Sequence, residues 1–330
     1  MVCDLKNLAR DECKILDAIV QIDNCKIIVG YFNRSGLKSD LKKTTKQEVP
    51  TRWNSQLEML ESMQFSWDKI KDIVNEPGCP HLATFNAIDK NTVDDSIDFL
   101  EPFEVHTKEL EGHLHPTIQK CCPAKHALLA HCRPCATDSE LVSAIKEKAR
   151  YLIQEKIVIA EEHKLALFLW PSMNELNAIP TECERKEVHA AMRRKALGVD
   201  AADIDNPDPG VQEGGPTPAK RRRADPYASL KTKKNVVSKD EIDKYLEMTA
   251  DDIGDDEDLL EWWRTKGTVP FPKMSKVAMD LLAIPGSSAP CETIWSDAGR
   301  IDTDERSSMK METLENNLVL RHYLRAKRSA

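Results

Sequence analysis

Apolar residues recur three or four positions apart along most of this chain, which is the spacing of an α-helix. Between residues 5 and 32 the pattern predicts two helices, and its apolar positions are Leu5, Leu8, Ile15, Ile19, Ile27, Val29, Tyr31 and Phe32. Five further helices are expected at residues 67–74, 93–110, 116–131, 141–160 and 179–195. Most of the first 196 residues should therefore be helical.

A short extended segment interrupts this pattern at residues 48–53. Val49 and Trp53 lie on either side of Pro50, and proline in a strand pattern is confined to sheet edges, so we expect an edge strand. A helix should follow with Asn54 or Ser55 as its N-cap, because short polar side chains accept hydrogen bonds from the first free N–H groups. The apolar face of that helix carries Leu57, Leu60 and Met63.

The composition changes after residue 197, where Asp, Pro, Gly and Lys replace large apolar residues. Such a segment buries too little apolar surface to offset the entropy of ordering it, so we expect a disordered linker at residues 197–238. The linker contains a basic cluster, Lys220, Arg221, Arg222 and Arg223. Short basic runs are typical of nuclear import signals or nucleic-acid patches. Import fits better, because four charges neutralise few phosphates and no aromatic residues interleave with them. A solvated charge run is the alternative.

Helical patterns return after the linker. One helix is expected at residues 239–248 with Ser238 as its cap, and another at residues 258–264. Pro270 and Pro272 break the chain before an apolar helix at residues 274–282. Residues 287–289 should cap the next helix, with Pro290 in its first turn. The last helix should start at residue 307 or 308 and carry Met311, Leu314 and Leu318 on one face.

Composition and charge narrow the class of protein. The 330 residues are long enough for two domains, and 41% hydrophobic with 31% charged residues is ordinary for a globular chain. The net charge of −8 gives no overall positive field toward nucleic acid. No run of about 18 apolar residues predicts a membrane span, and the first residues do not resemble a secretion signal. An intracellular protein without a membrane partner is expected.

Ten cysteines raise the question of a disulfide framework or a zinc site, but they are scattered along the chain. In a reducing compartment free thiols are the default. The one cluster with ligand-like spacing is Cys121, Cys122, His126, His131, Cys132 and Cys135. It lacks a second well-spaced pair, and adjacent helical residues point about 100° apart. We therefore expect thiols that pack between helices rather than a metal site.

The stretch from residue 281 to residue 324 reads LLAIPGSSAPCETIWSDAGRIDTDERSSMKMETLENNLVLRHYL. It is very similar to the C-terminal dimerisation segment of hobo/Activator-type (hAT) DNA transposases, where an apolar turn leads into Ser-Ser-Ala-x-x-Glu-Arg-x-Phe-Ser, then Ala-Gly and a final helix. Other blocks resemble the family in the same order: Pro-Thr-Arg-Trp-Asn-Ser at 50–55, Phe-Leu-Glu-Pro-Phe at 99–103 and His-Pro-Thr at 115–117. Thr293 and Trp295 depart from the family's arginine and phenylalanine.

The resemblance implies a ribonuclease-H-like core interrupted by a helical insertion, with three carboxylates that hold two metal ions. Such ions clamp the attacking and leaving oxygens of a phosphoryl displacement. In the family, the first two carboxylates lie on strands upstream of a helix that residues 5–8 of this chain resemble. Only the third carboxylate therefore has a counterpart in this sequence, which is Glu292. Asp4 and Asp11 lie in a predicted helix, where acidic residues usually complement the helix dipole. We therefore expect no enzymatic activity and no cofactor or metal, with Glu292 a relic ligand.

Arg52 and Trp53 match the family's Arg-Trp pair, and the resemblance implies a tryptophan that stacks on a base near the active centre. Base stacking on an aromatic side chain contributes about 1–3 kcal/mol, so a weak DNA contact is one expectation. The alternative, which we favour, is that Trp53 is a core residue, because tryptophan is highly buried on average.

The expected fold is mainly α, with an incomplete ribonuclease-H-like remnant (1–65), a helical insertion domain (66–196), the linker (197–238) and a C-terminal dimerisation domain (239–330). The expected function is that of a catalytically inactive, hAT-transposase-derived nuclear protein that forms a homodimer or binds a related hAT protein, with no small-molecule substrate. The alternative is a transposase fragment that keeps weak DNA binding or partners a full-length transposase. The dimerisation candidates are Leu281, Leu282, Trp295, Leu314 and Leu318.

Overall fold

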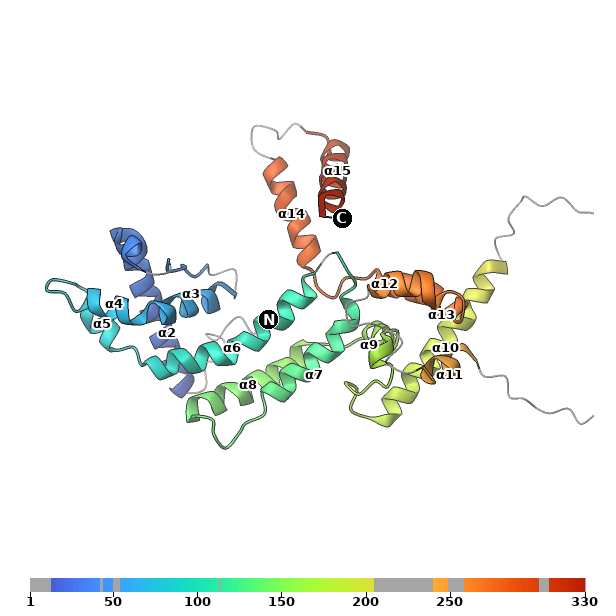
Figure 1. Ribbon diagram of the computed structural model, residues 1–330, viewed down its shortest axis with the longest axis horizontal. Helices are drawn as coiled ribbons and strands as arrows, with labels where there is room; N and C mark the ends of the chain where they lie inside the picture. The colour runs from blue at the N-terminus through green and yellow to red at the C-terminus, as the bar shows by residue number, and fades with distance from the viewer. Residues whose placement is uncertain are drawn as a thin grey trace, which may run out of the picture. The chain divides into compact units, whose positions relative to one another are not determined.

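Residues 13–41, 44–49, 54–112, 114–204, 240–248, 258–302 and 309–329 are described by a computed structural model (Figure 1). Within these ranges the chain is helical, with an isolated bridge residue at Val49 and no sheet. The mainly α expectation is confirmed, whereas the ribonuclease-H-like remnant is not visible in the described ranges. None of the helices described is both long and apolar enough to span a membrane.

The chain divides into two compact units, residues 1–160 with 285–330, and residues 161–284. In the described part of the first unit, the elements before residue 160 are α2 (Cys13–Ser35), η1 (Leu37–Asp40), α3 (Asn54–Phe65), α4 (Trp67–Val74), α5 (Leu82–Asn86), α6 (Lys90–Leu110), η2 (Ile118–Lys120), α7 (Cys121–His131) and α8 (Glu140–Lys156). It ends with α14 (Ala289–Ile301) and α15 (Met311–Ser329). The second unit holds α9 (Glu161–Phe168), η3 (Pro171–Met173), α10 (Glu182–Ile204), α11 (Glu241–Leu246), α12 (Leu259–Trp262), η5 (Trp263–Gly267) and α13 (Pro272–Leu282).

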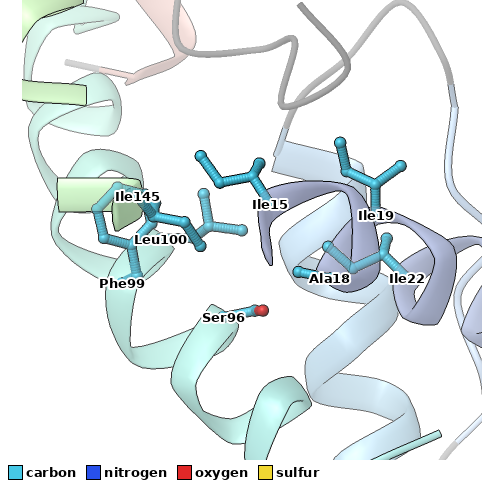
Figure 2. Close-up of a pocket in the computed structure, with 8 residues that line it drawn as sticks. All are labelled: Ile15, Ala18, Ile19, Ile22, Ser96, Phe99, Leu100 and Ile145. Atoms are coloured by element: carbon cyan, nitrogen blue, oxygen red, sulfur yellow. The ribbon is translucent and has the colours of Figure 1, made fainter. Parts of the chain in front are cut away.

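Helix α2 lies in the core of the first unit, where it packs on α3, α5, α6 and α8. Figure 2 shows one part of this core, a small apolar cavity of about 10 Å³ between the three helices α2, α6 and α8. Its lining residues are Ile15, Ala18, Ile19, Ile22, Ser96, Phe99, Leu100 and Ile145. Burial of each large apolar side chain contributes about 1.5–3 kcal/mol. Residues on both sides of the predicted boundary at residue 65 therefore share one core.

Aromatic side chains form the core of the second unit. Tyr245 is fully buried, with its ring centroid 5.3 Å from that of Phe168, 5.5 Å from that of Trp263 and 5.4 Å from that of Phe271. The indole Nε1 of Trp263 donates a 2.8 Å hydrogen bond to the carbonyl oxygen of Leu169, which satisfies the one polar atom of a buried tryptophan. Residues 161–204 and 240–284 are thus joined through one aromatic cluster.

Charged side chains also hold the two segments of the second unit together. Arg193 on α10 donates to the carboxylates of Asp240 and Asp243, each at 2.6 Å. The carboxylate of Glu241 accepts hydrogen bonds from the backbone N–H groups of Lys273 at 3.1 Å and Met274 at 3.0 Å. These N–H groups lie in the first turn of α13, where they have no partner inside the helix. Glu241 therefore caps α13, a helix that begins about thirty residues later in the chain, and it accepts the hydrogen bonds that an N-cap side chain usually accepts.

Several predicted boundaries agree with the structure. Helix α4 has the predicted bounds, and α6 and α13 begin within three residues of theirs. Helix α3 begins with Asn54 as its first helical residue, one position earlier than a cap at Asn54 would give. The apolar face predicted for α13 is buried, and it comprises Met274, Val277, Ala278, Leu281 and Leu282. Proline lies in the first turn of α14, as predicted.

Other predicted boundaries are wrong. The helix expected at residues 141–160 ends at Lys156, and α9 starts separately at Glu161. Helix α10 runs on to Ile204, past the start of the predicted linker, because Ala196, Leu197 and the alanines at 201 and 202 favour helix despite Gly198. Asp240 caps α11 by accepting a 2.7 Å hydrogen bond from the N–H of Asp243. The Ser55 hydroxyl donates to the carbonyl of Val49 and accepts a hydrogen bond from the N–H of Val49.

Candidate dimerisation surface

The start of α14 is fixed against the turn between α6 and α7, inside the first unit. The backbone N–H of Gly286 donates to the hydroxyl of Thr117 at 2.8 Å, and the Ser287 hydroxyl donates to the carbonyl of Leu110 at 3.0 Å. The Cys121 thiol donates to the carbonyl of Gly286 at 3.5 Å. A Cβ atom on Gly286 would lie 2.8 Å from the Thr117 carbonyl oxygen, so this approach requires glycine.

The first turn of α14 contains the predicted relic carboxylate, Glu292. Its side chain is exposed and accepts a 3.1 Å hydrogen bond from the Ser288 hydroxyl, one turn earlier. A carboxylate at this place complements the positive end of the helix dipole. The contacts of Glu292 are therefore those of a residue that stabilises a helix start.

Helices α14 and α15 pack on each other (Figure 1), and one buried carboxylate lies between them. The side chain of Asp297 is only 3% exposed, and it pairs with Arg325 at 2.5 Å and with Arg321 at 3.4 Å. His322 and Arg300 lie 3.7 Å and 3.8 Å from its oxygens. Burial alone would raise the pKa of Asp297, but the Arg325 hydrogen bond and the charges of Arg321 and Arg325 hold that pKa below its ordinary value.

The outer face of α15 is apolar and exposed. Val319 is 70% exposed, Tyr323 56% and Leu320 55%. Because successive helical residues are about 100° apart, these three side chains lie opposite the face that carries Arg321 and Arg325 toward Asp297. On α14, Trp295 is 75% exposed and Ile294 38%. Large exposed apolar groups are typical of an interaction site. We call these exposed apolar side chains of α14 and α15, Ile294, Trp295, Val319, Leu320, Tyr323 and Leu324, the hairpin surface.

The structure separates the predicted dimerisation residues into three settings. Trp295 lies on the hairpin surface. Leu314 and Leu318 are half-buried, on the side of α15 that faces α14. Leu281 and Leu282 are buried in the second unit, with exposed fractions of 6% and 2%. Sequence reasoning missed Val319, Leu320 and Tyr323, although their spacing marks a second face of the same helix.

The remaining candidates are placed as follows. Arg52, Trp53 and the basic cluster Lys220, Arg221, Arg222 and Arg223 lie outside the described residues. In the predicted zinc cluster, Cys121, Cys122 and Cys132 are buried, whereas Cys135 is exposed. The His131 ring nitrogen Nε2 lies 3.1 Å from the carbonyl oxygen of Phe99. Across the described ranges, no group of three or more potential ligand residues is arranged to hold a metal ion.

Comparison with known proteins shows that the hairpin surface lies in a region that matches a known family. Residues 241–324 match the family described as the hAT family C-terminal dimerisation region. This match contains α11 to α14 and α15 as far as residue 324, and so includes the whole hairpin surface.

The chain is also similar to individual proteins. The chain is 26% identical to the Transposable element Hobo transposase of Drosophila melanogaster, over 81% of this chain and 47% of that protein. It is 31% identical over 100 residues to the Zinc finger BED domain-containing protein DAYSLEEPER of Arabidopsis thaliana, which covers 30% of this chain and 14% of that protein. It is 28% identical over 92 residues to the Putative AC transposase of Zea mays, over 28% of this chain and 11% of that protein.

The chain spans about half the length of the Hobo transposase and smaller shares of the other relatives. The similarity to the Hobo transposase extends far beyond the C-terminal match, since it covers most of the chain. The chain is therefore an hAT-transposase-related protein that carries the family's C-terminal dimerisation region.

Proposed function

We propose that this chain acts by self-association through the hairpin surface, and that it does so in the nucleus without catalytic activity of its own. The observation that carries the proposal is the exposure of Trp295, Val319 and Tyr323 in a segment that matches a dimerisation region. Large aromatic and aliphatic side chains contribute most of the binding energy when an interface buries them. Leu281 and Leu282 contribute indirectly, by stabilising the second unit.

The contacts within the hairpin support the same surface. Asp297 with its arginine partners, together with half-buried Leu314 and Leu318, holds α15 against α14 by one face. The opposite face of α15 is then presented as one rigid apolar strip, and a preformed surface loses less entropy on binding.

The test of self-association is the solution mass of the whole purified chain, measured by light scattering across a dilution series. A dimer that dissociates on dilution is expected. Val319→Asp and Leu320→Asp should each shift the chain to monomer, because each places a charge in the buried interface. Val158→Asp and Val269→Asp are matched controls, since these valines are 75% and 86% exposed outside the hairpin surface. A monomer at every concentration would overturn the proposal.

The proposed lack of catalysis rests on the position of Glu292. Its carboxylate is engaged by Ser288 at a helix start, which gives it a structural role that needs no metal. Incubation of the chain with DNA and Mg²⁺ or Mn²⁺ should give no cleavage or strand transfer above the level of a Glu292→Gln variant. Cleavage that the Glu292→Gln substitution abolishes would contradict this part, and would favour an active transposase fragment.

Nuclear action is proposed from the basic cluster at residues 220–223 and from the similarity to a transposase. A fluorescent fusion should accumulate in the nucleus, and replacement of Lys220, Arg221, Arg222 and Arg223 by alanine should release it to the cytoplasm. Equal distribution of both fusions would argue against import through this cluster. The ribonuclease-H-like remnant stays a prediction, as do the DNA contact at Arg52 and Trp53 and the partnership with a full-length relative.

A further inference from the structure

We propose that two copies of this chain associate with their α15 helices antiparallel, so that Glu312 of one copy pairs with Lys327 of the other around a two-fold axis between Val319 and Leu320. This inference rests on the proposed self-association and specifies its geometry. Its basis is the order of residues along the outer face of α15.

The outer face of α15 carries one acidic and one basic end. At about 100° per residue, Glu312, Asn316, Val319, Leu320, Tyr323 and Lys327 share one side of the helix, and all six are exposed. Lys327 is placed there by a direct contact, since its Nζ lies 5.4 Å from the centroid of the Tyr323 ring. Arg321 and Arg325 point instead toward Asp297. The apolar centre therefore has a carboxylate toward one end and an ammonium toward the other.

This order is self-complementary under two-fold symmetry. In a symmetric dimer the same patch meets itself, so that if residue i contacts residue j then j also contacts i. Glu312 and Lys327 are equidistant from the midpoint between Val319 and Leu320, as are Asn316 and Tyr323. An antiparallel pairing about that midpoint places each Glu312 opposite a Lys327 and joins the apolar groups in the middle.

A parallel pairing of the same faces would have the opposite electrostatic result. It would place Glu312 against Glu312 and Lys327 against Lys327, and like charges across an interface are unfavourable. The dipoles of two parallel helices would also be aligned side by side, with like ends together. Charge complementarity therefore selects the antiparallel arrangement of two identical copies over the parallel one.

The experiment compares dissociation constants of the full-length chain and its charge variants at low and high salt. Glu312→Lys and Lys327→Glu should each weaken the dimer roughly tenfold at low salt, because each replaces two symmetry-related attractions by repulsions. The double variant E312K/K327E restores opposite charges and should dimerise like the wild type. High salt should reduce all of these differences.

Matched controls come from an exposed pair on α10, Glu182 and Lys186, whose charged atoms lie 2.7 Å apart within one helix of the second unit. Glu182→Lys and Lys186→Glu change the net charge by the same amounts and should leave the dissociation constant unchanged. Far-UV circular dichroism checks that all variants keep their helices.

A cross-linking measurement distinguishes the two arrangements directly. When Glu312→Cys and Lys327→Cys chains are mixed and oxidised, the antiparallel dimer should give the mixed disulfide above the level of the unsubstituted chain. A disulfide between two Glu312→Cys chains would overturn the proposal. A wild-type dimer that responds to E312K as it does to E182K would also overturn it, while leaving self-association intact. A wild-type monomer would instead remove the proposed function itself.

Discussion

The hydroxyl of Thr117 accepts a 2.8 Å hydrogen bond from the backbone N–H of Gly286, which lies 169 residues away in the sequence. Thr117 ends the His-Pro-Thr block, and Gly286 begins the Gly-Ser-Ser stretch ahead of α14. Two segments that both resemble the family in sequence thus meet in space. This contact fixes where the α14–α15 hairpin leaves the body of the first unit.

Removal of this hydrogen bond should destabilise the first unit. Thr117→Val leaves the Gly286 N–H without its partner and should lower the free energy of unfolding by about 1–2 kcal/mol. Thr117→Ser keeps the hydroxyl and is the matched control. Denaturant unfolding of the three chains measures the difference. Equal stability of Thr117→Val and wild type would mean that another acceptor replaces the hydroxyl.

Substitution of Gly286 should have a separate steric effect. The new Cβ atom of Gly286→Ala would lie 2.8 Å from the Thr117 carbonyl oxygen and 3.1 Å from the Cys121 sulfur. The backbone must move to relieve this clash, which should cost about 1–3 kcal/mol. Gly299→Ala is the control, since a Cβ atom there meets nothing within 4 Å. Denaturant unfolding should show a loss for the first variant and none for the second.

The second unit should depend on the Glu241 carboxylate. Glu241→Ala removes the carboxylate that accepts from the N–H groups of Lys273 and Met274, and should cost about 1 kcal/mol, as loss of an N-cap does. Glu241→Gln keeps an acceptor oxygen and should lose less. Amide hydrogen exchange over α13 is the measurement. If α13 exchanges equally fast in both variants, the charge rather than the acceptor is what matters.

The α14–α15 hairpin should lose stability in acid. Burial raises the pKa of Asp297, but Arg325, Arg321 and His322 together hold it below the ordinary value of 3.8. A carboxyl group whose folded pKa is depressed contributes stability that is complete above the unfolded pKa. That contribution is lost as the pH falls below about 3.8 and through the lowered folded value.

Asp297→Asn tests this pH dependence. The variant should be less stable than wild type at neutral pH, and the two should converge in acid, because protonated Asp297 is also uncharged. Hydrogen exchange of α14 and α15 between neutral pH and pH 2 measures both chains. A constant difference across the whole range would assign the effect to packing instead of charge.

The cysteines should react in an order set by exposure. Exposed Cys135 has its pKa lowered, first by hydrogen bonds from the backbone and side chain of Thr137. Burial raises the pKa of Cys132 and of Cys121 to about 11, and that of Cys25 to about 12. Only the thiolate is nucleophilic. Brief alkylation followed by peptide mass spectrometry should label Cys135 well before the three buried cysteines. Early labelling of Cys132 would contradict its buried position.

Local sequence patterns predicted where the helices lie in the chain better than they predicted how the helices pack on one another. The bounds of α4 and the buried face of α13 follow from apolar periodicity and proline positions, which act within a few residues. The core that α2 forms with α6 and α8 joins residues more than seventy positions apart, and no local pattern encodes such pairing. The Glu241 cap and the Arg193 pairs are equally non-local, so sequence reasoning did not find them.

For the candidate site, apolar character alone did not separate interior from surface. Leu281 and Trp295 were both predicted at the interface, yet Leu281 is buried in its own unit while Trp295 is 75% exposed. Apolar groups appear both in cores and in interfaces, and which they occupy depends on the tertiary neighbours of each helix. Val319 and Tyr323 were missed because α15 has two apolar faces. The sequence alone does not indicate which of these faces packs on α14 and which is exposed.

The family match at residues 241–324 does not correspond to one folded unit of this structure. Its first half, α11 to α13, completes a core with α9 and α10, while α14 and α15 group with the first unit. A cut at residue 240 would strip Tyr245, Trp263 and Phe271 from Phe168, and the excised piece would carry these aromatic groups without their cover. Truncation at the family boundary would therefore produce two fragments with exposed apolar cores that are prone to aggregate. Single substitutions on the surface of the intact chain are therefore the better test of self-association.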